Sequence, residues 1–173
     1  VDSRLVLIYC WRGGMRSGAV SWLLDMYGFK VYTLIGGYKK FRNHVLDTFK
    51  KPYHFNIIGG YTGSGKTELL KTLKEKGEKV IDLENIANHK GSAFGAIGLP
   101  PQPTQEMFEN LLSNELSAIR SQEGLRSTNY ELLTSCIWLE DESQRIGLVN
   151  FLGDLWKNMR GSKVWFLDIP FEE

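Results

Sequence analysis

One eight-residue stretch has the composition of a phosphate-binding loop. It reads Gly-Tyr-Thr-Gly-Ser-Gly-Lys-Thr over residues 60–67, after an apolar run at 55–59 and before an amphipathic run at 68–76. Glycines let backbone N–H groups converge on one anion, and the helix that follows adds partial positive charge there. An ordinary Gly/Ser-rich loop that caps a helix is the alternative. The residues that we predict to bind phosphate are Gly60, Gly63, Ser64, Gly65, Lys66 and Thr67, with the Thr67 hydroxyl as a candidate Mg²⁺ ligand.

A cysteine near the start of the chain has the surroundings of a nucleophile. Cys10 follows an apolar run at 5–9, which we expect to be a parallel strand covered on both faces. A Gly/Arg loop comes next, and periodicity predicts a helix over 18–27. The helix end and the guanidinium groups of Arg12 and Arg16 should lower the pKa of the thiol, because both favour the thiolate. A cysteine with only a structural role is the alternative.

Further candidate residues follow the predicted strands of the second part of the chain. A strand predicted over 79–84 has Asp82 and Glu84 at its carboxyl end, and a strand predicted over 135–139 runs into the acids Glu140, Asp141 and Glu142. Ligands of open parallel sheets bind at the carboxyl ends of strands, where an acid can hold Mg²⁺ or orient the attacking group. These acids are therefore candidates for the second half of the phosphate site.

Three basic side chains are candidates for the same site. His89 and Lys90 begin a glycine-containing segment that could hold a second phosphate or a leaving group, although a simple flexible connection explains it equally well. Arg145 follows the acids and could neutralise phosphate charge. Cys136 falls inside the predicted strand at 135–139, where we expect a buried and inert thiol.

The elements around these residues predict an α/β protein with two parts. We expect one domain over residues 1–50 and a P-loop domain over 51–173, with Pro52 at the boundary and both chain ends inside a longer protein. In the second part, Thr104 is a predicted N-cap, residues 121–131 a loop, 148–159 a helix and 163–167 the last strand.

Composition says more about the cellular compartment of the protein than about its binding partners. The 173 residues are 42% hydrophobic and 24% charged, and none of the apolar runs approaches the ~20 residues that cross a bilayer. Two cysteines in different contexts favour a reducing compartment, so we expect a cytoplasmic protein. The formal net charge of +1 neither requires nor excludes nucleic acid.

One segment has the composition of a nucleic-acid surface. Residues 38–51 interleave lysine and arginine with tyrosine and phenylalanine, and such side chains can neutralise phosphates and stack on bases. The alternative, slightly favoured by the sequence alone, is an amphipathic helix with a solvated charged face.

Residues 1–50 resemble the C-terminal part of a rhodanese domain, a sulfur-carrier fold whose loop cysteine holds a persulfide. The spacing from Cys10 to Arg16 is also that of cysteine-dependent phosphatases, and it makes the loop one residue longer than the usual rhodanese loop. That difference leaves open whether the loop binds a sulfane, a selenium-bearing group or a tetrahedral oxyanion.

The order of the motifs along the whole chain resembles the tRNA 2-selenouridine synthase family. The segments that carry the resemblance are 10–17, 60–67, 82–84, 89–95, 101–105, 140–143 and 145–147. The resemblance implies replacement of sulfur by selenium in the wobble 2-thiouridine of tRNA, with selenophosphate as donor and an S-geranylated intermediate made from geranyl diphosphate. It implies that Cys10, Arg12 and Arg16 serve the selenium step.

The same resemblance implies that the phosphate loop holds the diphosphate of geranyl diphosphate. Candidates for contact with the prenyl tail are Phe94, Trp138 and Trp156, although core packing explains aromatic residues more often. Two other functions fit the residues: an ATP- or GTP-dependent kinase with a sulfurtransferase-like module, and a non-catalytic, nucleotide-switched adaptor that binds RNA.

Overall fold

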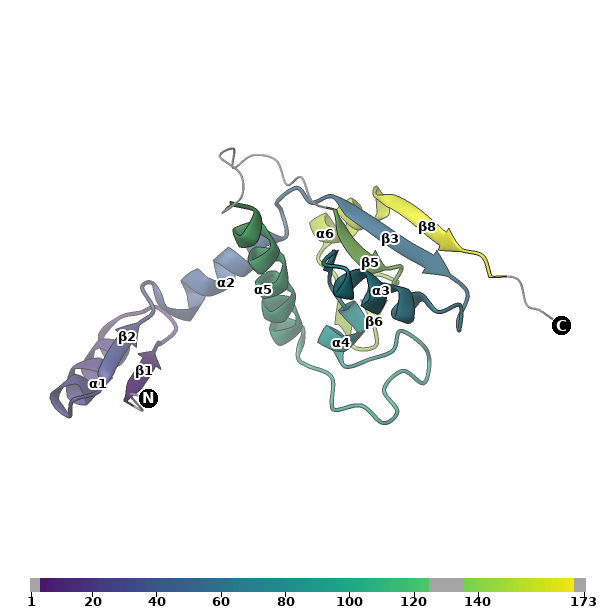
Figure 1. The fold of residues 1–173 in the computed structure, drawn as a ribbon. Coiled ribbons are helices and arrows are strands. Elements are labelled where there is room, and N and C mark those ends of the chain that lie inside the picture. Colours follow the sequence, from purple (N-terminus) through teal and green to yellow (C-terminus); the bar gives the residue numbers. More distant parts are fainter. Residues whose placement is uncertain (1–3, 125–135, 170–173) are drawn as a thin grey trace. The chain divides into compact units, whose positions relative to one another are not determined.

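The structure is a computed structural model that describes residues 4–124 and 136–169 (Figure 1). The chain divides into two compact units, Val1–Asp47 and Thr48–Glu173. Each unit contains helices and a parallel sheet, which confirms the predicted α/β class. The assignment of the first unit to a rhodanese-like domain stays a prediction.

The first unit is a two-stranded parallel sheet with two helices. Its elements are β1 (Leu5–Ile8), α1 (Met15–Met26), β2 (Lys30–Thr33) and α2 (Gly37–Thr48), the last of which ends at the unit boundary. Leu5 pairs with Lys30, and the register continues to Ile8 and Thr33. Helix α1 begins at Met15, three residues before the predicted start at 18.

The prediction that the first strand is covered on both faces is wrong for the part of the chain that the structure describes. Leu5 and Leu7 are both 60% exposed, whereas Val6 and Ile8 are partly buried. Successive side chains of a strand point to opposite faces, so one face of β1 is open and the other is partly covered.

The second unit is built on a four-stranded parallel sheet with the order β4-β5-β3-β8. The elements in chain order are β3 (Phe55–Gly60), α3 (Lys66–Glu75), β4 (Lys79–Val80), α4 (Leu83–Ala87), α5 (Gln105–Gly124), β5 (Ile137–Glu140), β6 (Arg145–Ile146), β7 (Val149–Asn150), α6 (Gly153–Arg160) and β8 (Lys163–Leu167). Strand β8 spans the predicted residues 163–167.

The centre of this sheet is buried. Helix α3 packs against β3, β4 and β5, and α6 packs against β3 (Figure 1). Ile57, Ile58, Ile137 and Leu139 are at most 2% exposed, as expected for parallel strands with cover on both faces. The loops at the carboxyl ends of β3 and β5 are thereby held on a rigid base.

Two strand predictions need correction. The strand predicted over 79–84 has only two residues, because the Asp82 carboxylate accepts a hydrogen bond from the Asn85 N–H at 2.9 Å and caps α4 instead. Cys136 precedes β5 and is exposed, so the buried thiol expected there is wrong. Ser135, the first residue of the strand predicted over 135–139, lies outside the described residues.

The predicted helix over 148–159 begins only at Gly153. Its first residues form β7, which pairs with β6 in an antiparallel hairpin. Gln105 donates from Nε2 to the Asn150 carbonyl and accepts from the Asn150 N–H, both at 2.8 Å, and Gln102 Oε1 accepts from the Leu148 N–H at 2.8 Å. These side-chain amides satisfy the hairpin backbone, which a sequence pattern does not reveal.

Helix α5 begins where the sequence predicted. The Met107 N–H donates to Thr104 Oγ1 at 3.3 Å, so Thr104 is the N-cap. The helix continues to Gly124, which makes the loop predicted over 121–131 wrong at its start; residues 125–131 lie outside the described part. Among the described helices, none is long and apolar enough to cross a membrane.

Candidate functional site

The residues between β3 and α3 have the geometry of a phosphate-binding loop. Strand β3 ends at Gly60 and α3 begins at Lys66, with Gly65 as its N-cap at φ +81°. Gly63 also has a left-handed φ of +82°, and a Cβ at either glycine would point into open space. The two glycines are therefore required by the backbone conformation of the loop and not by crowding.

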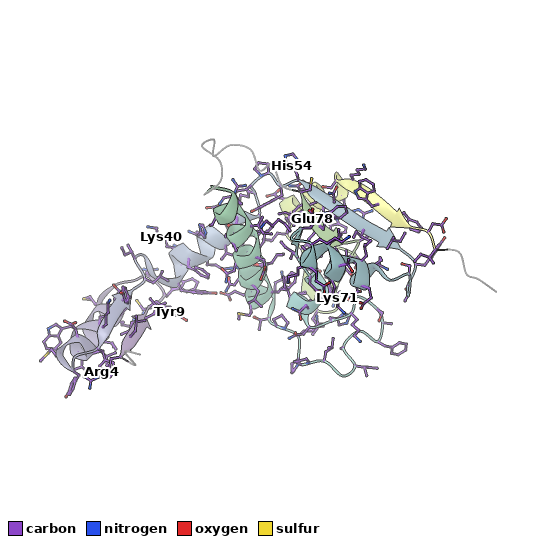
Figure 2. The ribbon with its side chains drawn as sticks, viewed as in Figure 1. Arg4, Tyr9, Lys40, His54, Lys71 and Glu78 are labelled. Carbon is purple, nitrogen blue, oxygen red and sulfur yellow. The ribbon has the colours of Figure 1, made fainter. Side chains whose placement is uncertain are left out.

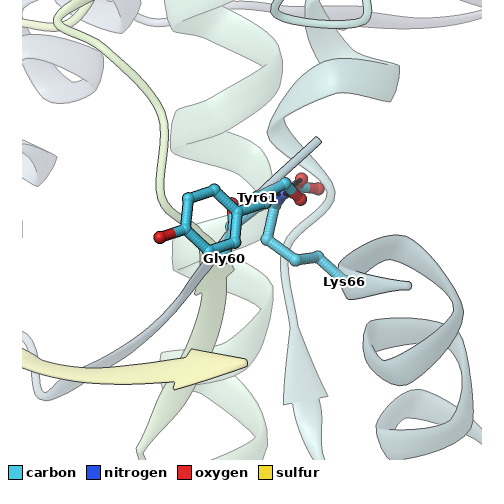
Figure 3. Close-up of polar contacts among 4 residues, drawn as sticks. Gly60, Tyr61 and Lys66 are labelled. Atoms are coloured by element: carbon cyan, nitrogen blue, oxygen red, sulfur yellow. Dashed lines mark hydrogen bonds and ion pairs between the residues drawn. The ribbon is translucent and has the colours of Figure 1, made fainter. Parts of the chain in front are cut away.

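The Lys66 side chain folds back over this loop. Its Nζ donates to the carbonyls of Gly60 and Tyr61, both at 3.1 Å, and lies 3.7 Å from Glu140 Oε1 (Figure 3). The ammonium and the carboxylate are mostly buried. The ammonium therefore already lies in the loop, with Glu140 as its counter-ion.

A cavity of about 490 Å³ opens beside the loop, within the usual range for small-molecule sites. One wall is the loop and the start of α3. The other wall consists of Glu84, Lys90, Gly91, Ser92, Glu140 and Glu142. The structure thus brings the predicted residues Lys90 and Glu140 to the phosphate loop.

Three carboxylates gather in this cavity. Oxygen atoms of Glu84, Glu140 and Glu142 lie within 4.8 Å of one another. Burial raises the pKa of all three. Repulsion by Glu140 adds to the effect at Glu84, and repulsion by Glu84 and Glu140 adds to it at Glu142, whose pKa is raised to about 7. Oxygen donors of this kind, beside the Thr67 hydroxyl, fit a hard divalent cation such as Mg²⁺.

The sequence placed Glu84 at the carboxyl end of one predicted strand and Glu142 in the acidic run after another, but neither was among the selected site residues. Glu142 follows Glu140 by two positions, the spacing that places two side chains on one face of an extended segment. That spacing is a usable signal. The signal for Glu84 is its position at the carboxyl end of the strand predicted over 79–84, although in the structure this residue lies in the short helix α4.

Five of the residues predicted for this site do not line the cavity, and one of them, Gly60, is the last residue of β3. Asp82 caps α4, and Asp141 forms an ion pair with Arg160 at 2.8 Å. Arg145 donates from Nε to the Gly147 carbonyl at 2.6 Å, within the turn between β6 and β7. His89 is only 8% exposed, and its ring lies beside Gly95 and Gly147.

Cys10 lies in the first unit, in the loop that leads from β1 to α1. Its Sγ is 3.3 Å from the Gly14 N–H and 3.4 Å from Ser17 Oγ. The hydrogen bond with the Ser17 hydroxyl, followed by backbone N–H groups of the loop, lowers the pKa of the thiol to about 6. The predicted lowering is confirmed, but its cause is this set of hydrogen bonds and not the guanidinium groups of Arg12 and Arg16.

Glycines hold this loop against the start of α2. A Cβ on Gly13 would come within 2.5 Å of the Gly37 nitrogen, and a Cβ on Gly37 would come within 2.2 Å of the Cys10 carbonyl oxygen. Both glycines also have positive φ, at +65° and +63°. The Tyr38 N–H can therefore reach the Cys10 carbonyl, at 3.0 Å.

The three aromatic residues considered for a prenyl tail differ in their surroundings. Trp156 stacks on Phe151 at 6.1 Å, and the Trp138 ring lies 6.1 Å from that of Trp165. Phe94 is 77% exposed and belongs to the segment whose residues Lys90, Gly91 and Ser92 line the cavity. Among these three, Phe94 is thus the exposed residue, and it lies two positions after Ser92 of the cavity wall.

Comparison with known proteins identifies relatives over almost the whole chain. The family model described as the tRNA 2-selenouridine synthase AAA domain matches residues 53–173. Proteins named tRNA 2-selenouridine synthase from Hydrogenovibrio crunogenus, Nitrosomonas eutropha and Pseudomonas aeruginosa are 40%, 38% and 35% identical, over 96%, 95% and 96% of this chain. These matches cover 44%, 40% and 42% of the relatives, so the chain spans about two fifths of their length. No solved structure matches. The chain belongs to the tRNA 2-selenouridine synthase family.

Proposed function

We propose that the protein containing this chain converts 2-thiouridine of tRNA into 2-selenouridine. The relatives carry the name of that activity. The observation that supports it best is the presence, in one chain, of an anion cavity around Lys66 and of a thiol, Cys10, whose pKa is lowered to about 6. The partner is tRNA, and the proposed reacting base is the wobble 2-thiouridine.

The phosphate loop binds the diphosphate of geranyl diphosphate in this proposal. The sulfur of 2-thiouridine attacks C1 of the geranyl group, the C–O bond breaks, and diphosphate leaves while the base loses its N3 proton. The Lys66 ammonium and the loop N–H groups neutralise the departing diphosphate. The reaction requires no nucleotide hydrolysis, so a phosphate-binding loop here does not imply ATP.

Mg²⁺ would be held by the Thr67 hydroxyl and the carboxylates of Glu84, Glu140 and Glu142. When bound, the cation would supply positive charge beside the diphosphate. Lys66 and Lys90 are the ammonium groups that line the cavity, where three carboxylates also lie. Phe94 contacts the prenyl tail, which its exposure next to the cavity supports.

Cys10, Arg12 and Arg16 serve the selenium step in this proposal. Selenium from selenophosphate attacks C2 of the base, the C–S bond breaks, and geranyl thiolate leaves; water then cleaves the P–Se bond and releases phosphate. Arg12 and Arg16 hold the phosphate of the donor, so that its selenium lies near Cys10. The order of strand, cysteine loop, helix and parallel strand supports a rhodanese-like domain for this unit.

Incubation of the full-length protein with 2-thiouridine tRNA tests the proposal. With geranyl diphosphate, nucleoside mass analysis should find 2-thiouridine that carries one geranyl group, and later addition of selenophosphate should give 2-selenouridine. Turnover of ATP or GTP without any change in the nucleosides would instead support a kinase. Unchanged cellular selenouridine in a Cys10→Ser strain would support a non-catalytic adaptor.

A further inference from the structure

Four aromatic rings form a continuous cluster in the first unit. The aromatic cluster consists of Tyr9, Trp11, Tyr38 and Phe41. The Tyr38 ring is at its centre, with centroids 6.0 Å from Tyr9, 5.8 Å from Trp11 and 5.8 Å from Phe41. The rings come from the end of β1, the cysteine loop and the first turns of α2.

The outer rings of the cluster are open to solvent. Tyr9 is 56% exposed and Trp11 is 54% exposed, although each contacts Tyr38 on one side. Grouped apolar surface of this kind on a protein commonly marks a binding site. Tyr9 is labelled in Figure 2, as is Lys40 of α2.

Positive charge surrounds the cluster. Arg12, Arg16, Lys39 and Lys40 are all exposed, and within residues 4–124 and 136–169 no acidic side chain forms an ion pair with them. Residues 1–47 contain seven Lys or Arg and three Asp, a formal charge of +4. Residues 48–173 contain fourteen and seventeen, a formal charge of −3. Basic charge is therefore concentrated in the unit that carries the cluster.

Backbone hydrogen bonds fix the cluster to the cysteine loop. The Tyr38 N–H donates to the Cys10 carbonyl at 3.0 Å, and the Lys39 N–H donates to the Trp11 carbonyl at 2.9 Å. Trp11 follows Cys10 directly, so their Cα atoms are about 3.8 Å apart. A flat group stacked on Trp11 would thus bind at the loop that carries the thiol.

Exposed rings beside lysines and arginines are the chemistry that binds single-stranded nucleic acid. Bases stack on the rings, and the cations neutralise the flanking phosphates. We propose that Tyr9 and Trp11 stack an unpaired RNA base beside Cys10 while Lys39 and Lys40 hold the adjacent backbone. This proposal rests on the proposed function and names the residues that present the target base to the thiol.

Binding of an RNA hairpin whose loop carries 2-thiouridine tests this surface. Fluorescence anisotropy on the full-length protein should show that Trp11→Ala weakens binding about 5- to 100-fold, because stacking on one ring contributes that much. Trp11→Phe should restore most of the affinity. Lys39→Ala should lower the slope of log affinity against log salt concentration by about 0.7, the value for one contact to a single strand.

Trp22→Ala is the matched control, since Trp22 is 64% exposed on α1 and contacts none of the four rings. It should leave hairpin affinity unchanged. The alkylation rate of Cys10 should be the same in Trp11→Ala and in the wild type, which shows that the cysteine loop is intact. If Trp11→Ala does not fold, the surface is tested by the affinity of Trp11→Phe, which should stay close to that of the wild type, and by the salt slope of Lys39→Ala, which should be lower than that of the wild type.

Wild-type affinity for the hairpin in Trp11→Ala, or equal losses of affinity in Trp11→Ala and Trp22→Ala, would contradict the proposed RNA-binding surface. Affinity that is independent of salt would also overturn it and would point to a protein segment as the occupant. The outcome for the proposed function is separate. If the hairpin binds as expected but its base is never converted, the proposed function fails while the surface stands.

Discussion

At Cys10, short-range hydrogen bonds set the state of the thiol. The Ser17 hydroxyl has one proton, which can go to the Gly14 carbonyl at 3.0 Å or to the cysteine sulfur at 3.4 Å. A thiolate is the better acceptor, so ionisation of Cys10 should draw that proton to the sulfur. Ser17, which the sequence reasoning named only as part of the loop, is thereby a positioning residue for the thiol.

The reactivity of Cys10 should therefore depend on pH with a midpoint near 6, where the pKa lies. Only the thiolate reacts with iodoacetamide, so the rate should fall as pH drops through 6 and should be level above about 7. Ser17→Ala removes the strongest stabilising hydrogen bond and should move the midpoint to higher pH. Mass spectrometry of the Cys10 peptide measures the rate.

Cys136→Ser is the control for that experiment, because Cys136 is the second thiol of this chain and is exposed, and the Cys10 profile should be unchanged in it. A midpoint near the ordinary thiol value of about 8.5 would contradict the assignment. A midpoint that does not move in Ser17→Ala would show that the hydroxyl does not stabilise the thiolate.

Lys66 should dominate the affinity for inorganic diphosphate. Its ammonium lies within the loop, and a charge-assisted hydrogen bond contributes about 1.5–3 kcal/mol. Lys66→Ala should thus weaken binding about 10- to 100-fold in isothermal titration calorimetry. Lys71→Ala is the control, because Lys71 is exposed on α3 and pairs with Glu68 at 2.9 Å. Equal losses in the two variants would argue against a specific site.

At the scale of elements, the phosphate cavity depends on three separate segments that bring acids to the loop. Glu84 comes from α4, Glu140 from the end of β5 and Glu142 from the residues after it. The strand-loop-helix context of the phosphate loop could be predicted, because glycine spacing and apolar runs are local signals. The acids could be placed near the carboxyl ends of predicted strands, but the grouping of Glu84 with Glu140 and Glu142 could not be predicted, because it depends on α4, which forms through the local cap at Asp82.

The same acids should make diphosphate binding depend on Mg²⁺. Removal of the cation with EDTA should weaken binding about tenfold, because the three carboxylates then repel the anion and only the ammonium groups of Lys66 and Lys90 that line the cavity oppose this repulsion. Glu142→Gln removes one negative charge, so this variant should lose less affinity in EDTA than the wild type does. Identical affinities with and without EDTA, in both proteins, would contradict a cation at this place.

The close contact between the cysteine loop and α2 predicts that replacing a glycine at this contact lowers stability. Gly37→Ala places a Cβ 2.2 Å from the Cys10 carbonyl oxygen at a positive φ, so it should lower the melting temperature and change the alkylation rate of Cys10. Gly18→Ala is the matched control, because Gly18 lies inside α1 with open space around it and alanine favours helix. Thermal unfolding followed by circular dichroism compares them; equal melting temperatures would refute the close contact.

At the scale of the whole chain, the sequence predicts the α/β fold class, the order of the motifs and the family. Its predictions of element boundaries and burial are wrong where these depend on contacts that the local pattern does not show. The helix predicted over 148–159 loses its first turn because Gln102 and Gln105, more than forty residues away, bind the hairpin backbone. Cys136 was placed in a strand by its apolar neighbours, yet β5 begins one residue later. The apolar run at 5–9 predicts that Leu5 and Leu7 are buried, yet both are exposed. An apolar run does not reveal whether another element packs on each face of the strand.

In the proposed function, two sites in two units perform two successive steps on one base. Mass analysis of tRNA nucleosides after incubation with the full-length protein, geranyl diphosphate and selenophosphate separates these two steps. Cys10→Ser should accumulate geranylated 2-thiouridine without selenouridine, whereas Lys66→Ala should leave most 2-thiouridine unmodified. Selenouridine at wild-type levels from Cys10→Ser, or arrest of both variants at the same nucleoside, would contradict the division of chemistry between the units.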